Sequence, residues 1–159
     1  MNKNGKHHAT IVLEHLYNST PSRIFTEFAD PVVRAGWAAP SGDELTYEEA
    51  AFKVGGRDVF RCGPKGDPKF RGETVYHLIE PDKCVVSSET LESGGQHLAV
   101  SLNTLELEPT ANGTRLKLTI QIVSSVGEAL ISGFESGNRS ALEGLAVHLA
   151  NFTDRHSLE

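Results

Sequence analysis

Four histidines are the first residues to consider for chemistry, because imidazole transfers protons near neutral pH. His15, His77, His97 and His148 lie in four different predicted elements, so no two of them share a catalytic spacing. The motifs G-x-S-x-G, H-E-x-x-H, the phosphate-binding P-loop and G-x-G-x-x-G are all missing from the sequence. The spacing therefore indicates no catalytic residues, and a single histidine is more often a surface or core residue.

Metal and redox sites are equally poorly supported. Cys62 and Cys84 lack the spacing of a zinc motif and are too few for a disulfide scaffold. Both lie in predicted strands, where a reduced cysteine behaves as a small apolar residue. We take a cytoplasmic location as the default expectation. The adjacent His7 and His8 lie in a polar stretch that we expect to be a tail, where ligands are poorly organised. We expect no metal and no cofactor.

Size and charge limit the possible classes of protein. The chain has 159 residues, which suits one domain with a sizeable core. Its net charge of −6 does not favour nucleic-acid binding, and no apolar stretch is long enough for membrane insertion. We expect a single domain over residues 9–152, a disordered tail over 1–8 and a second tail over 153–159. The final Leu158-Glu159 resembles a cloning scar.

The elements that would position a site begin with a strand over Ala9–Asn18. A short helix can start at Ser19-Thr20-Pro21, because a hydroxyl group caps the helix and proline fits its first turn. Asp30-Pro31 ends this helix and starts a second one, which contains Trp37.

From Leu45 onward the pattern changes to alternation, which is typical of strands with one buried face. The strongest turn signal is Asn112-Gly113, a pair that favours a tight hairpin. Consecutive hairpins predict an antiparallel meander. The expected strands are Thr46–Val54, Arg57–Cys62, Phe70–Ile79, Cys84–Leu91, His97–Glu108 and Thr114–Val123.

A long amphipathic helix is predicted from about Gly127 to Phe152, because its apolar residues recur at steps of three and four. Four glycines, Gly127, Gly133, Gly137 and Gly144, weaken this helix by about 1 kcal/mol each. Two interpretations remain open: the helix is simply a poor one, or the glycines allow a close approach or make room for a ligand. A twisted sheet covered by this helix would leave a cavity wherever the two do not touch.

Several short motifs carry a resemblance to a known family. In order they are Pro21-Ser22-Arg23-Ile24-Phe25, Asp30-Pro31 with Trp37, Val54-Gly55-Gly56, Gly72, Glu80-Pro81-Asp82-Lys83, Gly113-Thr114-Arg115, and Leu142 with Leu145 and Leu149. Together they resemble the START-like (SRPBCC, helix-grip) superfamily, and within it bacterial homologues of the activator of the ninety-kilodalton heat-shock chaperone ATPase. The resemblance implies an α+β helix-grip fold: a curved seven-stranded antiparallel sheet wrapped on a long C-terminal helix, with two short helices after the first strand.

The family frame and the alternation together suggest which residues line a cavity. Two positions depart from the family: Ala38 and Asn138 stand where tryptophan is frequent. A small side chain at 138 should leave a pocket of roughly 300–600 Å³. Asn103 and Asn138 are polar on otherwise apolar faces, and their amides either form internal hydrogen bonds or orient a ligand. The candidate ligand-binding residues are Trp37, Phe52, Phe60, Tyr76, Asn103, Leu118, Phe134 and Asn138.

Three functions follow as expectations. The first is a non-catalytic binder of a small hydrophobic molecule, either a lipid or an aromatic compound, in a monomer or weak dimer. The second is an interaction module that contacts the chaperone, which fold analogy alone supports. The third is an enzyme, a cyclase or hydrolase, that uses the same cavity.

Overall fold

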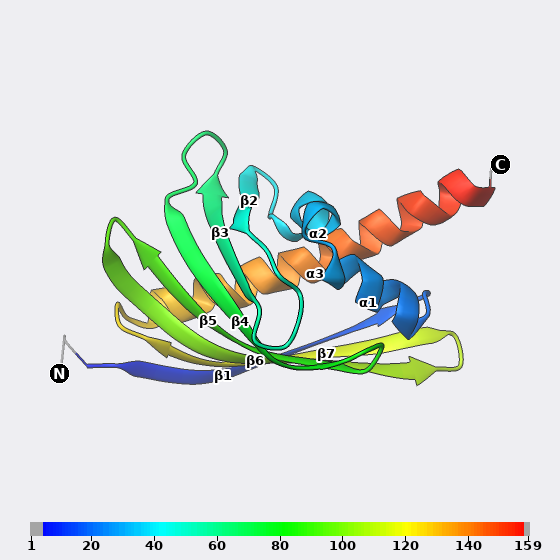
Figure 1. Cartoon of the computed structure of the whole chain (residues 1–159), viewed down its shortest axis with the longest axis horizontal. Coiled ribbons are helices and arrows are strands. Elements are labelled where there is room, and N and C mark those ends of the chain that lie inside the picture. The colour runs from blue at the N-terminus through cyan, green and yellow to red at the C-terminus, as the bar shows by residue number, and fades with distance from the viewer. Residues whose placement is uncertain (1–4, 158–159) are drawn as a thin grey trace.

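Alternating apolar residues build a single sheet of seven antiparallel strands, in the order β1-β7-β6-β5-β4-β3-β2 (Figure 1). The computed structural model describes residues 5–157, with side chains to residue 151. This α+β architecture confirms the predicted fold class. The elements are β1 (His7–Tyr17), α1 (Pro21–Ala29), α2 (Pro31–Ala38), β2 (Asp43–Glu49), β3 (Arg57–Pro64), β4 (Phe70–Glu80), β5 (Cys84–Ser93), β6 (Gln96–Thr110), β7 (Gly113–Ser124) and α3 (Glu128–Ser157).

The two short helices begin where the sequence predicts. Thr20 caps α1, its hydroxyl oxygen accepting a hydrogen bond from the backbone N–H of Arg23 (3.2 Å). Asp30 ends α1 and caps α2, because its carboxylate accepts from the N–H groups of Val32 and Val33. The break at Asp30-Pro31 therefore turns the chain, so that α2 packs against α3 and β2 rather than continuing α1.

Helix α3 crosses the concave side of the sheet (Figure 1). Its C-terminal half joins the main core, where Leu142, Leu145 and Leu149 pack with residues of β1 and β7 such as Leu13 and Leu116. Gly144 is required there, because a Cβ atom at this position would collide with the carbonyl oxygen of Trp37 on α2. The N-terminal part of α3 packs through Leu130 and Phe134 against a second cluster of Phe60, Leu91 and Leu98. A pocket occupies the space between these two packed regions.

Both ends of one predicted strand differ from the structure by more than two residues. The strand expected over Thr46–Val54 is β2, Asp43–Glu49, and it has a bulge between Tyr47 and Glu49. The chain then leaves the sheet, because the carboxylate of Asp58 binds the N–H of Ala51 and a loop closes through Gly56. Phe52 therefore lies in this loop and not in a strand.

The ends of the domain are also longer than expected. His7 and His8, predicted to lie in a tail, are part of β1 and pair with Ser124 and Val123 of β7. Helix α3 continues to Ser157, past the predicted boundary at residue 152. Leu158 and Glu159 lie outside the described residues. Among residues 5–157, no helix combines the length and the apolar character that crossing a membrane requires.

Candidate functional site

A pocket of about 520 Å³ lies between α3, α2 and the concave face of the sheet. Its wall is mostly apolar, and it is partly open to solvent. Pockets of this size and character commonly hold small molecules.

All eight candidate residues lie on the wall of this pocket. They come from six elements and one loop: Trp37 on α2, Phe52 in the loop after β2, Phe60 on β3, Tyr76 on β4, Asn103 on β6, Leu118 on β7, and Phe134 and Asn138 on α3. Alternation along the strands and the stripe on the helix bring them together. Their role in binding a ligand remains a prediction.

The two asparagines are in different situations. The Nδ2 group of Asn138 donates to the carbonyl oxygen of Phe134 in its own helix (2.9 Å), which is an internal hydrogen bond. The Oδ1 atom of Asn103 is buried and has no hydrogen-bond partner among the described residues. The indole Nε1 of Trp37 is likewise buried without a partner there. Unpaired buried polar atoms cost about 1–3 kcal/mol each. Both atoms are closed off from solvent, so neither faces the open space of the pocket although both residues line it.

The glycines of α3 divide into two kinds. Gly144 serves the close approach of α2, as described above. Gly133 and Gly137 line the pocket, and a Cβ atom on either would meet nothing within 4 Å. Packing between helix and sheet therefore does not require these two glycines, whereas an occupant of the pocket would benefit from the space that they leave.

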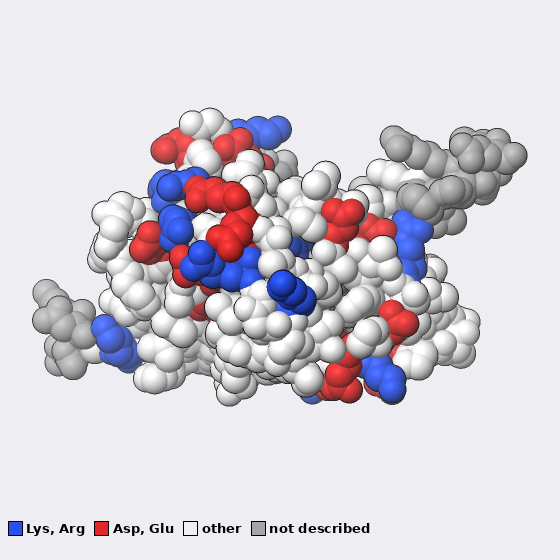
Figure 2. Space-filling model, viewed as in Figure 1, with Lys and Arg blue, Asp and Glu red and all other residues white. Residues whose placement is uncertain are grey.

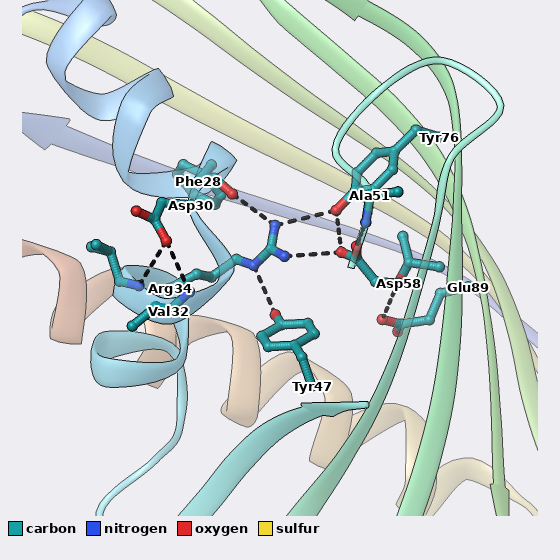
Figure 3. Close-up of polar contacts among 11 residues, drawn as sticks. Phe28, Asp30, Val32, Arg34, Tyr47, Ala51, Asp58, Tyr76 and Glu89 are labelled. Atoms are coloured by element: carbon teal, nitrogen blue, oxygen red, sulfur yellow. Dashed lines mark hydrogen bonds and ion pairs between the residues drawn. The ribbon is translucent and has the colours of Figure 1, made fainter. Parts of the chain in front are cut away.

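A cluster of polar side chains around Arg34 borders the pocket, and no motif in the sequence predicted it (Figure 3). Nη2 of Arg34 donates to Oδ2 of Asp58 (2.9 Å), and its Nε donates to the hydroxyl of Tyr47 (2.7 Å). Nη1 donates to the carbonyl of Phe28 (2.7 Å) and to the hydroxyl of Tyr76 (3.2 Å). The hydroxyl of Tyr76 in turn donates to Asp58. The guanidinium group thus ties α2 to β2, β3 and β4.

Burial keeps the two tyrosines of this cluster neutral at neutral pH. Burial raises the pKa of Tyr76, and the positive charge of Arg34 only partly opposes it. Burial likewise raises the pKa of Tyr47. Burial lowers the pKa of Arg34, but Tyr47, Tyr76 and Asp58 outweigh this effect and raise it overall. Arg34 and Asp58 therefore form an ion pair, with two phenols as hydrogen-bonding neighbours.

Glu89 is a further polar residue of the pocket wall that no motif in the sequence predicted. It shares the inward face of β5 with Val85, Ser87 and Leu91 and lines the pocket. Burial raises the pKa of its carboxyl group from 4.5 to about 7, although Thr74 and the charge of Arg34 oppose the shift. The hydroxyl of Thr74 donates a long hydrogen bond of 3.5 Å to it. Glu89 thus places a weakly hydrogen-bonded carboxyl group in the mostly apolar wall of the pocket.

The histidines considered for chemistry have separate partners, and the thiol of Cys62 is protonated. The four histidines have different partners: the Leu16 carbonyl for His15, Ser88 for His77, Ser125 for His97 and Glu27 for His148. Cys62 lines the pocket, but burial raises the pKa of its thiol to about 11 and keeps it protonated at neutral pH. Within the part of the chain that the structure describes, no three His, Cys, Asp or Glu residues are grouped to hold a metal ion.

On the face of the molecule that Figure 2 shows, acidic and basic side chains are mixed rather than separated by sign. At the end formed by β2, β3 and β4, acidic and basic side chains alternate and pair. The exposed ion pairs include Arg57 with Glu49, Arg61 with Glu48, and Arg71 with Glu73. The view in Figure 2 shows no broad basic area of the kind that binds a nucleic-acid backbone.

Comparisons with known proteins place the chain among relatives of the same fold. The sequence model of the family described as "Activator of Hsp90 ATPase homolog 1-like protein" matches residues 18–150. The solved structure of the Mll3558 protein from Rhizobium loti is 35% identical, has a TM-score of 0.77 and aligns over 90% of this chain and 98% of its own. A search of curated proteins gives no match.

Two more distant structures support the fold alone. A protein from Rhizobium leguminosarum has a TM-score of 0.81 at 21% identity, over 92% of this chain and 97% of its own. A protein from Nitrosomonas europaea has a TM-score of 0.72 at 16% identity, over 91% of this chain and 96% of its own.

Proposed function

This chain belongs to the family of Activator of Hsp90 ATPase homolog 1-like proteins, and we propose that it binds a small, mostly apolar molecule in the pocket between α3 and the sheet. The pocket volume of about 520 Å³ and its aromatic and aliphatic wall support this proposal. The ligand would be a lipid-like or aromatic compound, and binding would need no cofactor.

The observation that carries the proposal is the open space at Gly133 and Gly137. Each glycine costs a helix about 1 kcal/mol relative to alanine. Both positions would accept a methyl group without any contact within 4 Å, so packing does not explain why they lack one. Both line the pocket. A ligand that lies along this side of α3 explains the pair better than a poor helix does.

The test uses Trp37, the single tryptophan of the chain, which lies on the pocket wall. Titration with the neutral ligand 1-decanol should change Trp37 fluorescence in a saturable way. Gly137→Leu should weaken binding, because the new side chain enters the pocket. Gly36→Leu is the matched control: Gly36 is a helix glycine with open space, and it does not line the pocket.

Two results would count against the proposal. One is the absence of saturable binding of decanol, and of a small aromatic probe such as naphthalene. The other is equal binding by Gly137→Leu and Gly36→Leu, because the ligand would then lie elsewhere.

The family match favours a second candidate function, contact with a chaperone ATPase as the family description suggests. Such a module would act through its surface and would not need the pocket. Addition of the protein to purified Hsp90 should then raise ATP turnover. Unchanged turnover together with no complex in a pull-down would exclude this function. Gly137→Leu should stimulate turnover as well as the wild type does if the surface alone matters.

A further inference from the structure

The ionisable groups on the pocket wall are unequal in sign. Four acidic residues, Asp43, Glu44, Asp58 and Glu89, line the pocket with a single basic one, Arg34. Arg34 is already occupied: it pairs with Asp58 at 2.9 Å and donates to Tyr47 and to the carbonyl of Phe28, both at 2.7 Å. A ligand carboxylate would therefore find no unpaired cation among the described residues of the wall. It would instead face the carboxyl group of Glu89.

Glu89 is the acceptor on the pocket wall that lacks a strong donor. Its carboxyl group accepts one long hydrogen bond, from Thr74 at 3.5 Å, and no other among the described residues. Asn103 lies diagonally across on β6, since Glu89 lies opposite Ser101 and Ser87 lies opposite Asn103. Its Oδ1 atom also lacks a partner among the described residues, but that atom is closed off from the pocket. A ligand group that carries several N–H donors would therefore satisfy the carboxyl group of Glu89.

The surroundings of Glu89 suit an apolar chain. Leu91 follows Glu89 on the same face of β5 and packs in one cluster with Phe60 and Leu98. From the other side, Leu130 and Phe134 of α3 contact this cluster. The rings of Tyr47 and Phe60 lie close by, with centroids 6.2 Å apart, and aromatic faces attract cations.

We infer that the pocket selects amphipathic amines, with the ammonium group at the carboxyl group of Glu89 and the apolar part along α3. The inference rests on the proposed function and names the chemical class of its ligand. An ammonium group offers three donors, which the two oxygens of the Glu89 carboxyl group and solvent or a nearby hydroxyl can accept. The charge of Arg34 does not oppose the ligand strongly, because Asp58 compensates it at 2.9 Å.

Several titratable groups share the pocket wall with Glu89. Arg34 of α2, Tyr47 of β2 and Cys62 of β3 interact with it electrostatically. The others that line the pocket are Asp43 and Glu44 of β2, Asp58 of β3 and Tyr76 of β4. Burial raises the pKa of both Tyr47 and Cys62, so neither carries charge near neutral pH. The residues of α3 that line the pocket carry no ionisable side chain. A change in amine binding between pH 6 and pH 8 that disappears in Glu89→Gln would therefore report the carboxyl group of Glu89.

The experiment compares decylamine, 1-decanol and decanoate by calorimetry, each below its aggregation concentration. At pH 8 we expect decylamine to bind about tenfold more tightly than decanol, a difference of about 1.4 kcal/mol, and decanoate to bind most weakly. Decylamine stays charged from pH 6 to pH 8. Its affinity should therefore rise over this range as Glu89 ionises.

Glu89→Gln should remove both the preference for the amine and its pH dependence, and it should leave decanol binding within about twofold. Glu92→Gln is the matched control, a carboxyl group on the same strand that pairs with Arg71 and does not line the pocket. Equal affinities of amine and alcohol for the wild type, or an unchanged preference in Glu89→Gln, would overturn the inference while the proposed function stands. If none of the three compounds binds, the proposed function fails and the inference fails with it.

Discussion

Arg34 of α2 and Asp58 of β3 form an ion pair whose atoms Nη2 and Oδ2 lie 2.9 Å apart, with side chains only 12% and 3% exposed. The pair joins α2 to β3, the strand next to the sheet edge formed by β2. Tyr47 and Tyr76 complete its hydrogen bonds. Because Trp37 follows one turn later on the same helix and lines the pocket, this ion pair also holds one side of the pocket in place.

Asp58→Ala should lower the free energy of unfolding by about 3–5 kcal/mol, because it leaves the buried guanidinium group of Arg34 without its counter-charge. Urea denaturation would measure the loss. The control is Glu48→Ala, which removes the partner of Arg61 from a pair whose side chains are 47% and 46% exposed. This change should cost less than about 1 kcal/mol. Equal effects of the two substitutions would contradict a buried ion pair at Arg34.

Two glycines of α3 should respond in opposite ways to the same substitution. Gly133→Ala should stabilise the protein by about 0.5–1 kcal/mol, because the methyl group enters open space and alanine favours a helix. Gly144→Ala should destabilise it, because the new Cβ atom would collide with the carbonyl of Trp37. Thermal unfolding of both variants would check the difference. A destabilised Gly133→Ala would show that this part of α3 is closely packed.

The raised pKa of Glu89 predicts a stability change with pH. Its carboxyl group titrates near 4.5 in the unfolded chain and at about 7 in the folded one, so the folded state favours the protonated form. The resulting stabilisation is complete below pH 4.5 and is lost as the pH rises through about 7. Each pKa unit corresponds to about 1.4 kcal/mol, so the total is about 3 kcal/mol.

The stability of Glu89→Gln should lack this dependence on pH, because glutamine does not titrate. As the pH rises from 5 to 8, the free energy of unfolding of the variant minus that of the wild type should therefore increase by about 2–3 kcal/mol. Chemical denaturation of both proteins at the two pH values measures the change. A constant difference between them would mean that Glu89 titrates at an ordinary pKa.

Asn138→Trp should fill part of the pocket, since Asn138 lines it one turn before Leu142. Stability should stay within about 1 kcal/mol of wild type or increase, because the larger ring regains packing. Binding of decanol should weaken, because substitutions that fill a functional cavity often increase stability at the expense of binding. Calorimetry and urea denaturation on the same preparation would separate the two effects. Undiminished binding would place the ligand away from Asn138.

Local signals were enough to predict most of the fold. Thr20 and Asp30 cap their helices through hydrogen bonds that depend only on neighbouring residues. Alternation likewise predicted the strands of the meander to within one or two residues at most ends. The predicted C-terminal end of β2 was wrong, because the strand ends near a contact between Asp58 and Ala51 that no local pattern encodes.

The pocket was predictable only in its apolar part. Phe60, Leu118 and Phe134 follow the periodicity of their elements, which indicates the face that they occupy. Arg34 and Glu89 gave no such signal, since charged residues in a short helix or strand usually face solvent. One observation could have suggested Glu89: it stands in the alternating register of Val85, Ser87 and Leu91.

Mapping of a bound ligand by NMR tests the central claim most directly. In a titration of isotope-labelled protein with 1-decanol, we expect shifts at the pocket residues and intermolecular contacts to the methyl groups of Leu118, Leu130 and Leu142. The same titration of Gly137→Leu should show weaker shifts. Contacts confined to the outer face of the sheet, at exposed residues such as Val100 and Leu102, would contradict a binding pocket between α3 and the sheet.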